Sequence, residues 1–105
     1  MNETAEWVMD LYLQTHLDRE KIFKVLVQTG LGTLQPQFTL SGGAIEVSVR
    51  RNPDKSGASP FGASPVIIET AKPKSTSESE FQHALKILLD CLDREKIGYH
   101  KVSKA

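Results

Sequence analysis

The chain has a single cysteine, no long apolar run and no excess of charge of either sign. Cys91 alone can form neither an intrachain disulfide nor a cysteine-based metal cluster. No segment is apolar for long enough to span a membrane, and the N-terminus, MNETAEWVMD, lacks the basic start and apolar stretch of a signal peptide. With 13 basic and 13 acidic residues the formal net charge is zero, so no overall field attracts nucleic acid or an anionic membrane. We therefore expect a cytoplasmic protein that does not bind membranes.

The length and composition of the chain are those of one folded domain. The chain has 105 residues, of which 39% are apolar and 25% are charged, as in ordinary globular proteins. A chain of this length buries enough surface to fold without disulfides or a metal. We therefore predict a single small α+β domain over residues 1–105, with no cofactor.

The first 30 residues contain apolar side chains at helical spacing. The polar stretch QTHLD (14–18) divides this region, and Asp18 could cap a second helix. We favour two helices within residues 3–30 over one long helix, ended by Gly30 and Gly32. The apolar stripe consists of Trp7, Val8, Leu11, Tyr12, Ile22, Phe23, Val25 and Leu26.

After Pro36 the apolar residues alternate instead. In GAIEVSVRR (43–51) every second residue is aliphatic, which is typical of a strand with one buried face. QFTL (37–40) and SPVIIETAK (64–72) are expected to form the neighbouring strands. The inward side chains would be Phe38, Leu40, Ile45, Val47, Val49, Val66 and Ile68. The other, mostly polar face would carry Gln37, Thr39, Glu46, Ser48, Arg50, Ile67 and Glu69.

The last third predicts a long helix. Ser77 and Glu80 have the spacing of a capping box, and Gly98 stands where a left-handed residue would end the helix. The stretch YHKV (99–102) is long enough for a short final edge strand. The order is therefore α-β-β-β-α, with a three- or four-stranded antiparallel sheet and all helices on one face. The buried stripe of the helix would be Phe81, Ala84, Leu85, Leu88 and Leu92.

Between the second and third predicted strands lies NPDKSGASPFGASP (52–65). Its glycine, proline and serine content predicts a flexible hairpin loop at residues 52–64. The loop and its base are locally basic, with one aromatic residue at the centre, so we predict that this loop binds a partner. The residues of this predicted site are Arg50, Arg51, Lys55 and Phe61. A secondary basic site, Lys72 and Lys74, would lie at the opposite end of the strands.

Patterns typical of enzymes are missing. The histidines, His16, His83 and His100, are far apart, and Cys91 has no basic neighbour that would activate it. The glycine-rich stretches do not match a phosphate-binding loop. Glu69 and Lys72 would lie on opposite faces of a strand, unlike the acid and lysine of PD-(D/E)XK nucleases. We therefore predict a protein without catalytic residues or a metal site.

The order of elements resembles that of the double-stranded-RNA-binding domain. IFKVLVQTG (22–30) and QPQFTL (35–40) are similar to its first helix and first strand, and this resemblance implies RNA binding. That family binds phosphates with lysines at the start of its last helix, where this chain reads STSESE (75–80). The leading prediction is therefore a non-enzymatic protein-interaction module, acting as an adaptor, inhibitor or regulatory partner of another protein. Nucleic-acid binding is the alternative, and self-association is left open.

Overall fold

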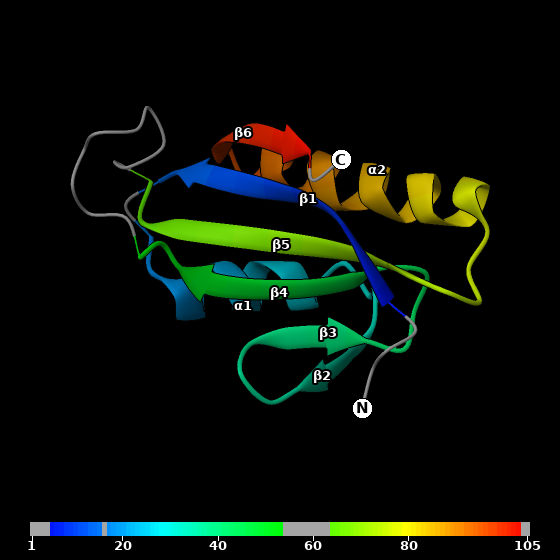
Figure 1. The fold of residues 1–105 in the computed structure, drawn as a ribbon. Helices are drawn as coiled ribbons and strands as arrows, with labels where there is room; N and C mark the ends of the chain where they lie inside the picture. The colour runs from blue at the N-terminus through cyan, green and yellow to red at the C-terminus, as the bar shows by residue number, and fades with distance from the viewer. Residues whose placement is uncertain (1–4, 16, 54–63, 104–105) are drawn as a thin grey trace.

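The computed structural model describes residues 5–15, 17–53 and 64–103. These form one antiparallel sheet of six strands in the order β2-β3-β4-β5-β1-β6, with two helices (Figure 1). The strands are β1 (Ala5–Gln14), β2 (Thr33–Gln35), β3 (Thr39–Ser41), β4 (Glu46–Arg51), β5 (Val66–Pro73) and β6 (Gly98–Ser103), and the helices are α1 (Arg19–Val27) and α2 (Glu78–Arg94).

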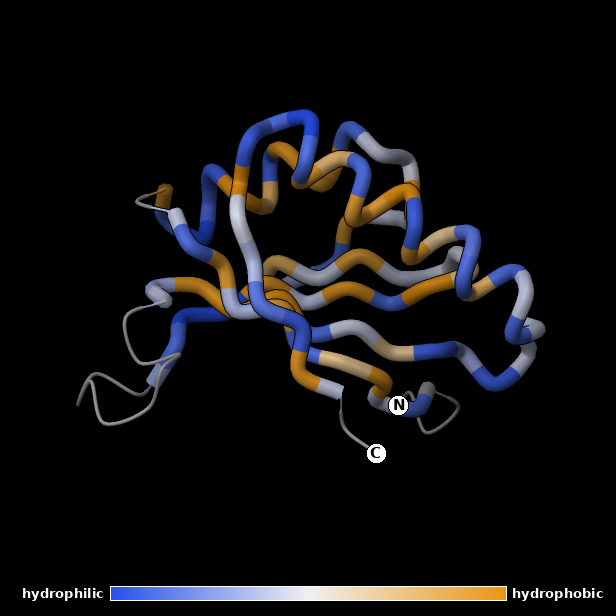
Figure 2. Tube along the Cα trace, turned by 90° about the horizontal axis from the view of Figure 1, so that it is seen from above, coloured by the Kyte–Doolittle hydropathy of each residue, from blue (hydrophilic) through white to orange (hydrophobic). Residues whose placement is uncertain are grey.

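Both helices lie on one face of the sheet, and the two layers are separate when seen from above (Figure 2). The core between them consists of aliphatic and aromatic side chains from α1, α2, β1, β3, β4 and β5 and from the loops beside them. Without the short β2–β3 pair, the chain follows the β-α-β-β-α-β order of ferredoxin-like domains. That order is shared by proteins of unrelated function, so it fixes the architecture and no more. The α+β class and the helices on one face are confirmed.

The prediction of a helix at the N-terminus is wrong for residues 5–14, which form β1. This strand pairs with β5 on one side and with β6 on the other, so it lies inside the sheet. Leu11 and Leu13 are completely buried beneath the helices. Two neighbouring strands and a shared core stabilise the extended backbone more than the local helical spacing could stabilise a helix. The element order is therefore β-α-β-β-β-β-α-β.

The first helix, α1, begins where the sequence predicts. Asp18 is its N-cap, and Oδ1 of Asp18 accepts the backbone N–H of Lys21 at 3.0 Å. This bond satisfies an amide that has no partner within the helix. Gly30 follows the helix with φ +70°, a left-handed conformation that suits glycine. Asp18 and Gly30 thus bound this segment as predicted.

The central strands follow the predicted alternation. Ile45, Val47 and Val49 are buried, as are Val66 and Ile68. Of the strand predicted over QFTL, only Thr39 and Leu40 are in β3; the preceding residues form a turn in which Phe38 has φ +55°, and the additional strand β2 lies before that turn. Phe38 is therefore outside the strand, where its ring packs edge-on against Phe23 of α1 at 5.5 Å. The sheet is larger than predicted because β1 and β2 were not recognised.

The last helix, α2, carries the capping box. Oγ of Ser77 accepts the N–H of Glu80, and Oε1 of Glu80 accepts the N–H of Ser77, both at 3.2 Å. The Ser77 hydroxyl also donates to Oε1 of Glu80 at 2.9 Å, and this bond, together with that from the Ser77 N–H, holds the pKa of the Glu80 carboxyl below its ordinary value. All five residues of the predicted stripe are buried. Gly98 does not end the helix: Lys96 takes the left-handed position at φ +59°, and Gly98 begins β6, the predicted final strand.

Candidate functional site

The predicted basic loop is only partly within the described residues. Arg51 is exposed at the end of β4, whereas Lys55 and Phe61 lie outside the described ranges. A hydrogen bond joins the two ends of the loop: Nδ2 of Asn52 donates to the carbonyl of Ser64 at 2.8 Å. Asn52 and Ser64 are each only 5% exposed. The prediction of a flexible loop therefore does not fit these two end residues, and it stays a prediction for the residues between them.

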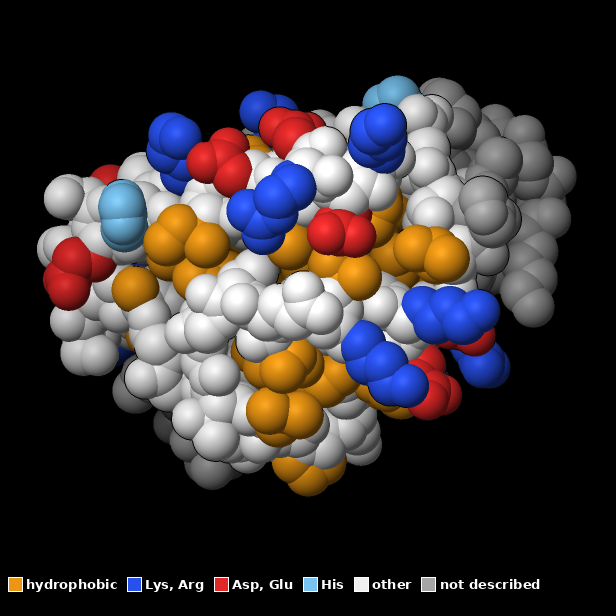
Figure 3. All heavy atoms as spheres, turned by 180° about the vertical axis from the view of Figure 1, so that it is seen from behind, with side chains coloured by type: hydrophobic (Ala, Val, Ile, Leu, Met, Phe, Trp, Pro, Cys, Tyr) orange, Lys and Arg blue, Asp and Glu red, His pale blue; other side chains and the backbone are white. Residues whose placement is uncertain are grey.

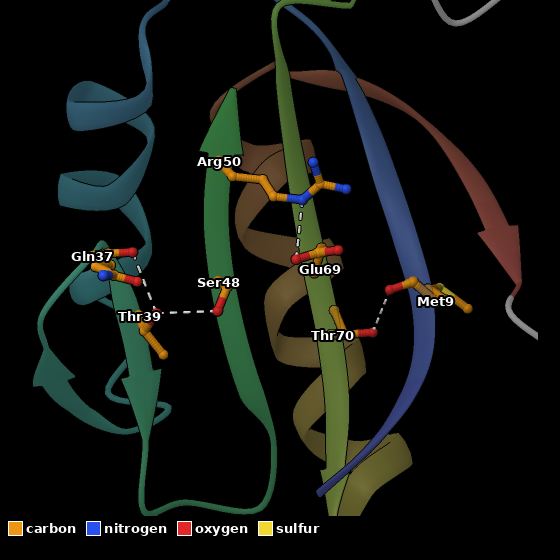
Figure 4. Close-up of polar contacts among 7 residues, drawn as sticks. All are labelled: Met9, Gln37, Thr39, Ser48, Arg50, Glu69 and Thr70. Carbon is orange, nitrogen blue, oxygen red and sulfur yellow. Dashed lines mark hydrogen bonds and ion pairs between the residues drawn. The ribbon is translucent and has the colours of Figure 1, made fainter. Parts of the chain in front are cut away.

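Arg50 belongs to the sheet rather than to the loop. Its Nε lies 3.0 Å from Oε1 of Glu69 on β5, and the guanidinium reaches across that strand (Figure 4). The Arg50 side chain is 39% exposed and that of Glu69 only 14%. Arg51, the next residue, points to the other side of the strand because side chains alternate. The predicted group of Arg50 with Arg51 is therefore split between two faces.

The secondary basic residues lie at the far end of the same strands. Arg51 pairs with Val66 at one end of β5, and Glu46 pairs with Ala71 at the other. Lys72 follows Ala71, and the exposed Lys74 lies in the turn that leads to α2. The two basic pairs are therefore separated by the length of β4, as expected from antiparallel pairing.

The face of the sheet opposite the helices is uncovered in the described structure, and we call it the open face. Cross-strand pairing places side chains on it in rows: Thr39–Ser48–Glu69–Asp10 and Arg50–Ile67–Tyr12. The predicted polar character is confirmed for Thr39, Ser48, Arg50 and Glu69. Ile67 and Ala71 are nearly fully buried, yet neither belongs to the core cluster beneath the helices. They form a buried apolar layer beneath the polar side chains of the open face.

A β-bulge turns Trp7 onto the open face. Met9 pairs with Thr70, and Trp7 pairs with the next residue, Ala71, so that Val8 is an extra residue in β1. Under strict alternation Trp7 would lie on the helix side, together with Met9 and Leu11. Directly paired residues point to the same face, so Trp7 instead joins Ala71 on the open face, where it is 46% exposed. The sequence pattern alone places Trp7 in a buried helical stripe, and it contains no signal of the bulge.

The bulge is held by a side chain from the neighbouring strand. Oγ1 of Thr70 donates to the carbonyl of Met9 at 2.9 Å (Figure 4). Thr70 is completely buried. This bond satisfies a backbone acceptor at the point where the regular pairing of β1 is interrupted.

A hollow of about 570 Å³ lies beside Trp7. Its lining contains two aromatic residues, two arginines, three polar residues and one acid: Trp7, Phe38, Arg19, Arg50, Gln37, Thr39, Ser48 and Glu69. Oγ of Ser48 and Oγ1 of Thr39 are 3.1 Å apart, and the Thr39 hydroxyl is also 3.3 Å from the carbonyl of Gln37 (Figure 4). The guanidinium carbon of Arg19 lies 4.4 Å from the centre of the Phe38 ring. The hollow thus combines aromatic surface with hydrogen-bonding and cationic groups.

A second hollow, of about 550 Å³, lies on the helix side between α2 and the loops that follow α1 and β3. His83 and Ile87 line it, and Ile87 is 36% exposed. Basic and acidic side chains are interspersed over this side of the molecule (Figure 3). The pairs Lys24–Glu20 and Lys86–Asp90 are examples, at 3.6 and 3.0 Å. The helix side therefore presents no continuous charge of one sign.

The remaining candidates for chemistry are isolated. Cys91 is 2% exposed, and burial raises the pKa of its thiol, which makes the thiolate less accessible. Within the described part of the chain, no group of three or more histidine, cysteine, aspartate or glutamate residues could hold a metal ion. None of the described helices is both long and apolar enough to cross a membrane.

Comparison of the chain with protein-family models, with curated proteins and with solved structures gave no match.

Proposed function

We propose that this protein is a non-enzymatic protein-interaction domain that binds a partner protein on its open face. The observation that supports this most is the position of Trp7, which a bulge turns out of the core and leaves 46% exposed beside a hollow of about 570 Å³. Tryptophan is among the residues that contribute most to binding at protein interfaces. An exposed tryptophan on a strand that is paired with β5 is well suited to anchor a partner.

The surroundings of Trp7 resemble a small interface in composition. The partly exposed rings of Trp7 and Phe38 provide apolar surface, and Ser48 and Thr39 offer hydroxyls at the side of the hollow. Interfaces typically have an apolar centre and a polar rim. The open face therefore offers both the surface for close packing and the groups for orientation.

The same face favours a protein partner over nucleic acid. Asp10 lies in the same row as Glu69, and Glu46 lies in the row of Ala71 and Trp7. These three acids outnumber the two arginines that line the hollow, Arg19 and Arg50. A nucleic-acid strand that stacked on Trp7 would bring its phosphates close to these carboxylates. Lys72 and Lys74 are at the far end of the strands from Arg51, so they cannot extend a phosphate-binding path from it.

A photo-reactive amino acid at Ser48 tests the proposal, with one at the exposed Gln82 of α2 as the control. In extracts of the native source, we expect crosslinks to a protein from Ser48 and none from Gln82. The crosslinked protein is then purified and titrated calorimetrically with the wild type and with Trp7→Ala. Trp7→Ala should weaken binding at least tenfold, whereas Ile87→Ala, which truncates an exposed apolar residue on the helix side, should not change it.

Two outcomes would overturn the proposal. Crosslinks from Ser48 to RNA or DNA, with an affinity that falls steeply with salt, would favour the nucleic-acid alternative. Equal weakening by Trp7→Ala and Ile87→Ala would place the interface elsewhere. The loop residues Lys55 and Phe61 stay predicted additional contacts. Lys55→Glu and Phe61→Ala in the same titration show whether they contribute.

A further inference from the structure

We infer that the hollow beside Trp7 recognises a carboxylate, supplied by a glutamate or aspartate side chain of the partner next to an apolar residue. This inference rests on the proposed function and specifies what the partner presents. Its basis is that two guanidinium groups line the same hollow, and each is held in place by a different neighbour.

Arg50 is positioned by Glu69. The contact uses Nε, at 3.0 Å from Oε1 of Glu69, and the two Nη nitrogens extend away from that contact (Figure 4). Glu69 is 14% exposed, so it is held at the sheet surface, while the Arg50 side chain is 39% exposed. Arginine can use its remaining N–H groups to hold a second carboxylate, with the geometry fixed by the first.

Arg19 is positioned by an aromatic ring instead of an acid. Its guanidinium lies over Phe38 at 4.4 Å, and Phe38 packs edge-on against Phe23. A ring attracts the cation but does not neutralise its charge. Arg19 therefore brings a full positive charge to the hollow, and its orientation is set before any ligand binds.

The balance of charge in the lining selects the ligand class. Arg19 and Arg50 contribute two positive charges and Glu69 one negative charge, which leaves an excess of one positive charge. A single carboxylate would neutralise this excess and could accept hydrogen bonds from the guanidinium groups. A phosphate monoester, with nearly two negative charges, would exceed it and would be repelled by Glu69 more strongly than a carboxylate. The Ser48 hydroxyl can donate to the same ligand, whereas the Thr39 hydroxyl donates to the carbonyl of Gln37.

Trp7 determines what accompanies the carboxylate. Its partly exposed ring and the Phe38 ring line the same hollow as the two arginines. An acidic residue directly beside a leucine or similar side chain would satisfy both kinds of surface. A free carboxylate would use only the cationic part and should bind much more weakly.

The inference can be tested without the natural partner, because Trp7 is the only tryptophan in the chain and reports on the hollow. The probe is a capped six-residue peptide with one glutamate between two leucines, and the matched control is the same peptide with glutamine. We expect the glutamate peptide to change Trp7 fluorescence and to bind at least tenfold more tightly than the glutamine peptide. Its binding should weaken several-fold when salt is raised from 0.05 to 0.5 M.

The variants are chosen as matched pairs. Arg50→Gln and Arg19→Gln should each weaken the glutamate peptide about tenfold or more. Arg51→Gln, one residue further along the same strand but on its other side, should not change it. Arg50→Lys retains the charge without the planar guanidinium, so it tests the geometry if Arg50→Gln folds poorly, and it should also lose affinity.

Equal binding of the two peptides, or equal effects of Arg50→Gln and Arg51→Gln, would overturn the inference. Inorganic phosphate competing more strongly than acetate would also contradict it. These failures are distinct from failure of the proposed function. A crosslinked protein whose binding depends on Trp7 but not on Arg19, Arg50 or salt would leave the interaction domain standing and remove only the carboxylate site.

Discussion

Replacing Thr70 by valine should destabilise the protein and disturb the position of Trp7. The Thr70 hydroxyl is buried and donates to the carbonyl of Met9 at 2.9 Å, beside the bulge. Valine has nearly the same shape as threonine but no hydroxyl. The free energy of unfolding should therefore fall by the cost of leaving the buried carbonyl of Met9 without its hydrogen-bond donor. Such a loss is about 1–3 kcal/mol. We expect a loss of this size in urea denaturation followed by circular dichroism.

Two further measurements decide whether the hydroxyl holds the bulge. Acrylamide quenching of Trp7 fluorescence should change in the Thr70→Val variant, because Trp7 owes its exposed position to the bulge. Thr39→Val is the control: its half-buried hydroxyl bonds at 3.1 Å to Ser48, and water can replace that bond at a cost below about 1 kcal/mol. A Thr70→Val protein with wild-type stability and quenching would refute this explanation of the bulge.

The remaining predictions concern α2 and its surroundings. Leu88→Ala should cost about 2–5 kcal/mol because Leu88 is completely buried, whereas Ile87→Ala, at a position 36% exposed, should cost under about 1 kcal/mol; equal costs in denaturation would show that the helix faces the sheet differently. Cys91 should react with a thiol reagent at pH 8 far more slowly in the folded than in the unfolded protein, because burial raises its pKa above the ordinary 9.0; equal rates would mean that the thiol is accessible. The pKa of Glu80 is lowered from 4.5 in the folded state, so its stabilising contribution is complete above pH 4.5 and is lost as pH falls through the folded pKa. Ser77→Ala should make denaturation midpoints fall less steeply below pH 4.5, and an unchanged pH dependence would contradict the capping-box explanation.

The sequence predicts a helix or strand correctly where the local pattern of residues is compatible with only one kind of secondary structure. Ile45, Val47 and Val49 alternate over a stretch too short for a helix, and Ser77 with Glu80 defines a helix start whatever surrounds it. The segment at residues 5–14 has no such single solution. Its apolar residues fit helical spacing, and the extra residue at Val8 interrupts the period of two that would have indicated a strand. Only pairing with β5 and β6, distant in sequence, decides its conformation.

The candidate site was hidden from the sequence for the same reason. Arg50 and Glu69 were both predicted on the polar face, and their pairing at 3.0 Å follows from the register of β4 with β5. The sequence does not place Trp7 in this site, because it gives no sign that β1 is a strand. It does not place Arg19 there either, because Arg19 lies over the ring of Phe38, which is distant in sequence, and lines the hollow with it. The residues of this site come from five separate segments of the chain, so no single segment contains a motif for it.

The place of β1 inside the sheet also sets an order for folding. Its two neighbours, β5 and β6, are synthesised after α1, β2, β3 and β4, so the ribosome releases β1 long before either partner exists. Closing such long loops is slow, and folding cannot be completed until the last strand has emerged. Until then, Leu11 and Leu13 lie on a strand with an unpaired edge, the kind of surface that joins other chains into aggregates. β6 contributes little to the core, but it pairs with the edge of β1 and so covers it. The new edge of the sheet is then β6 itself, where His100 and Lys101 are exposed to solvent.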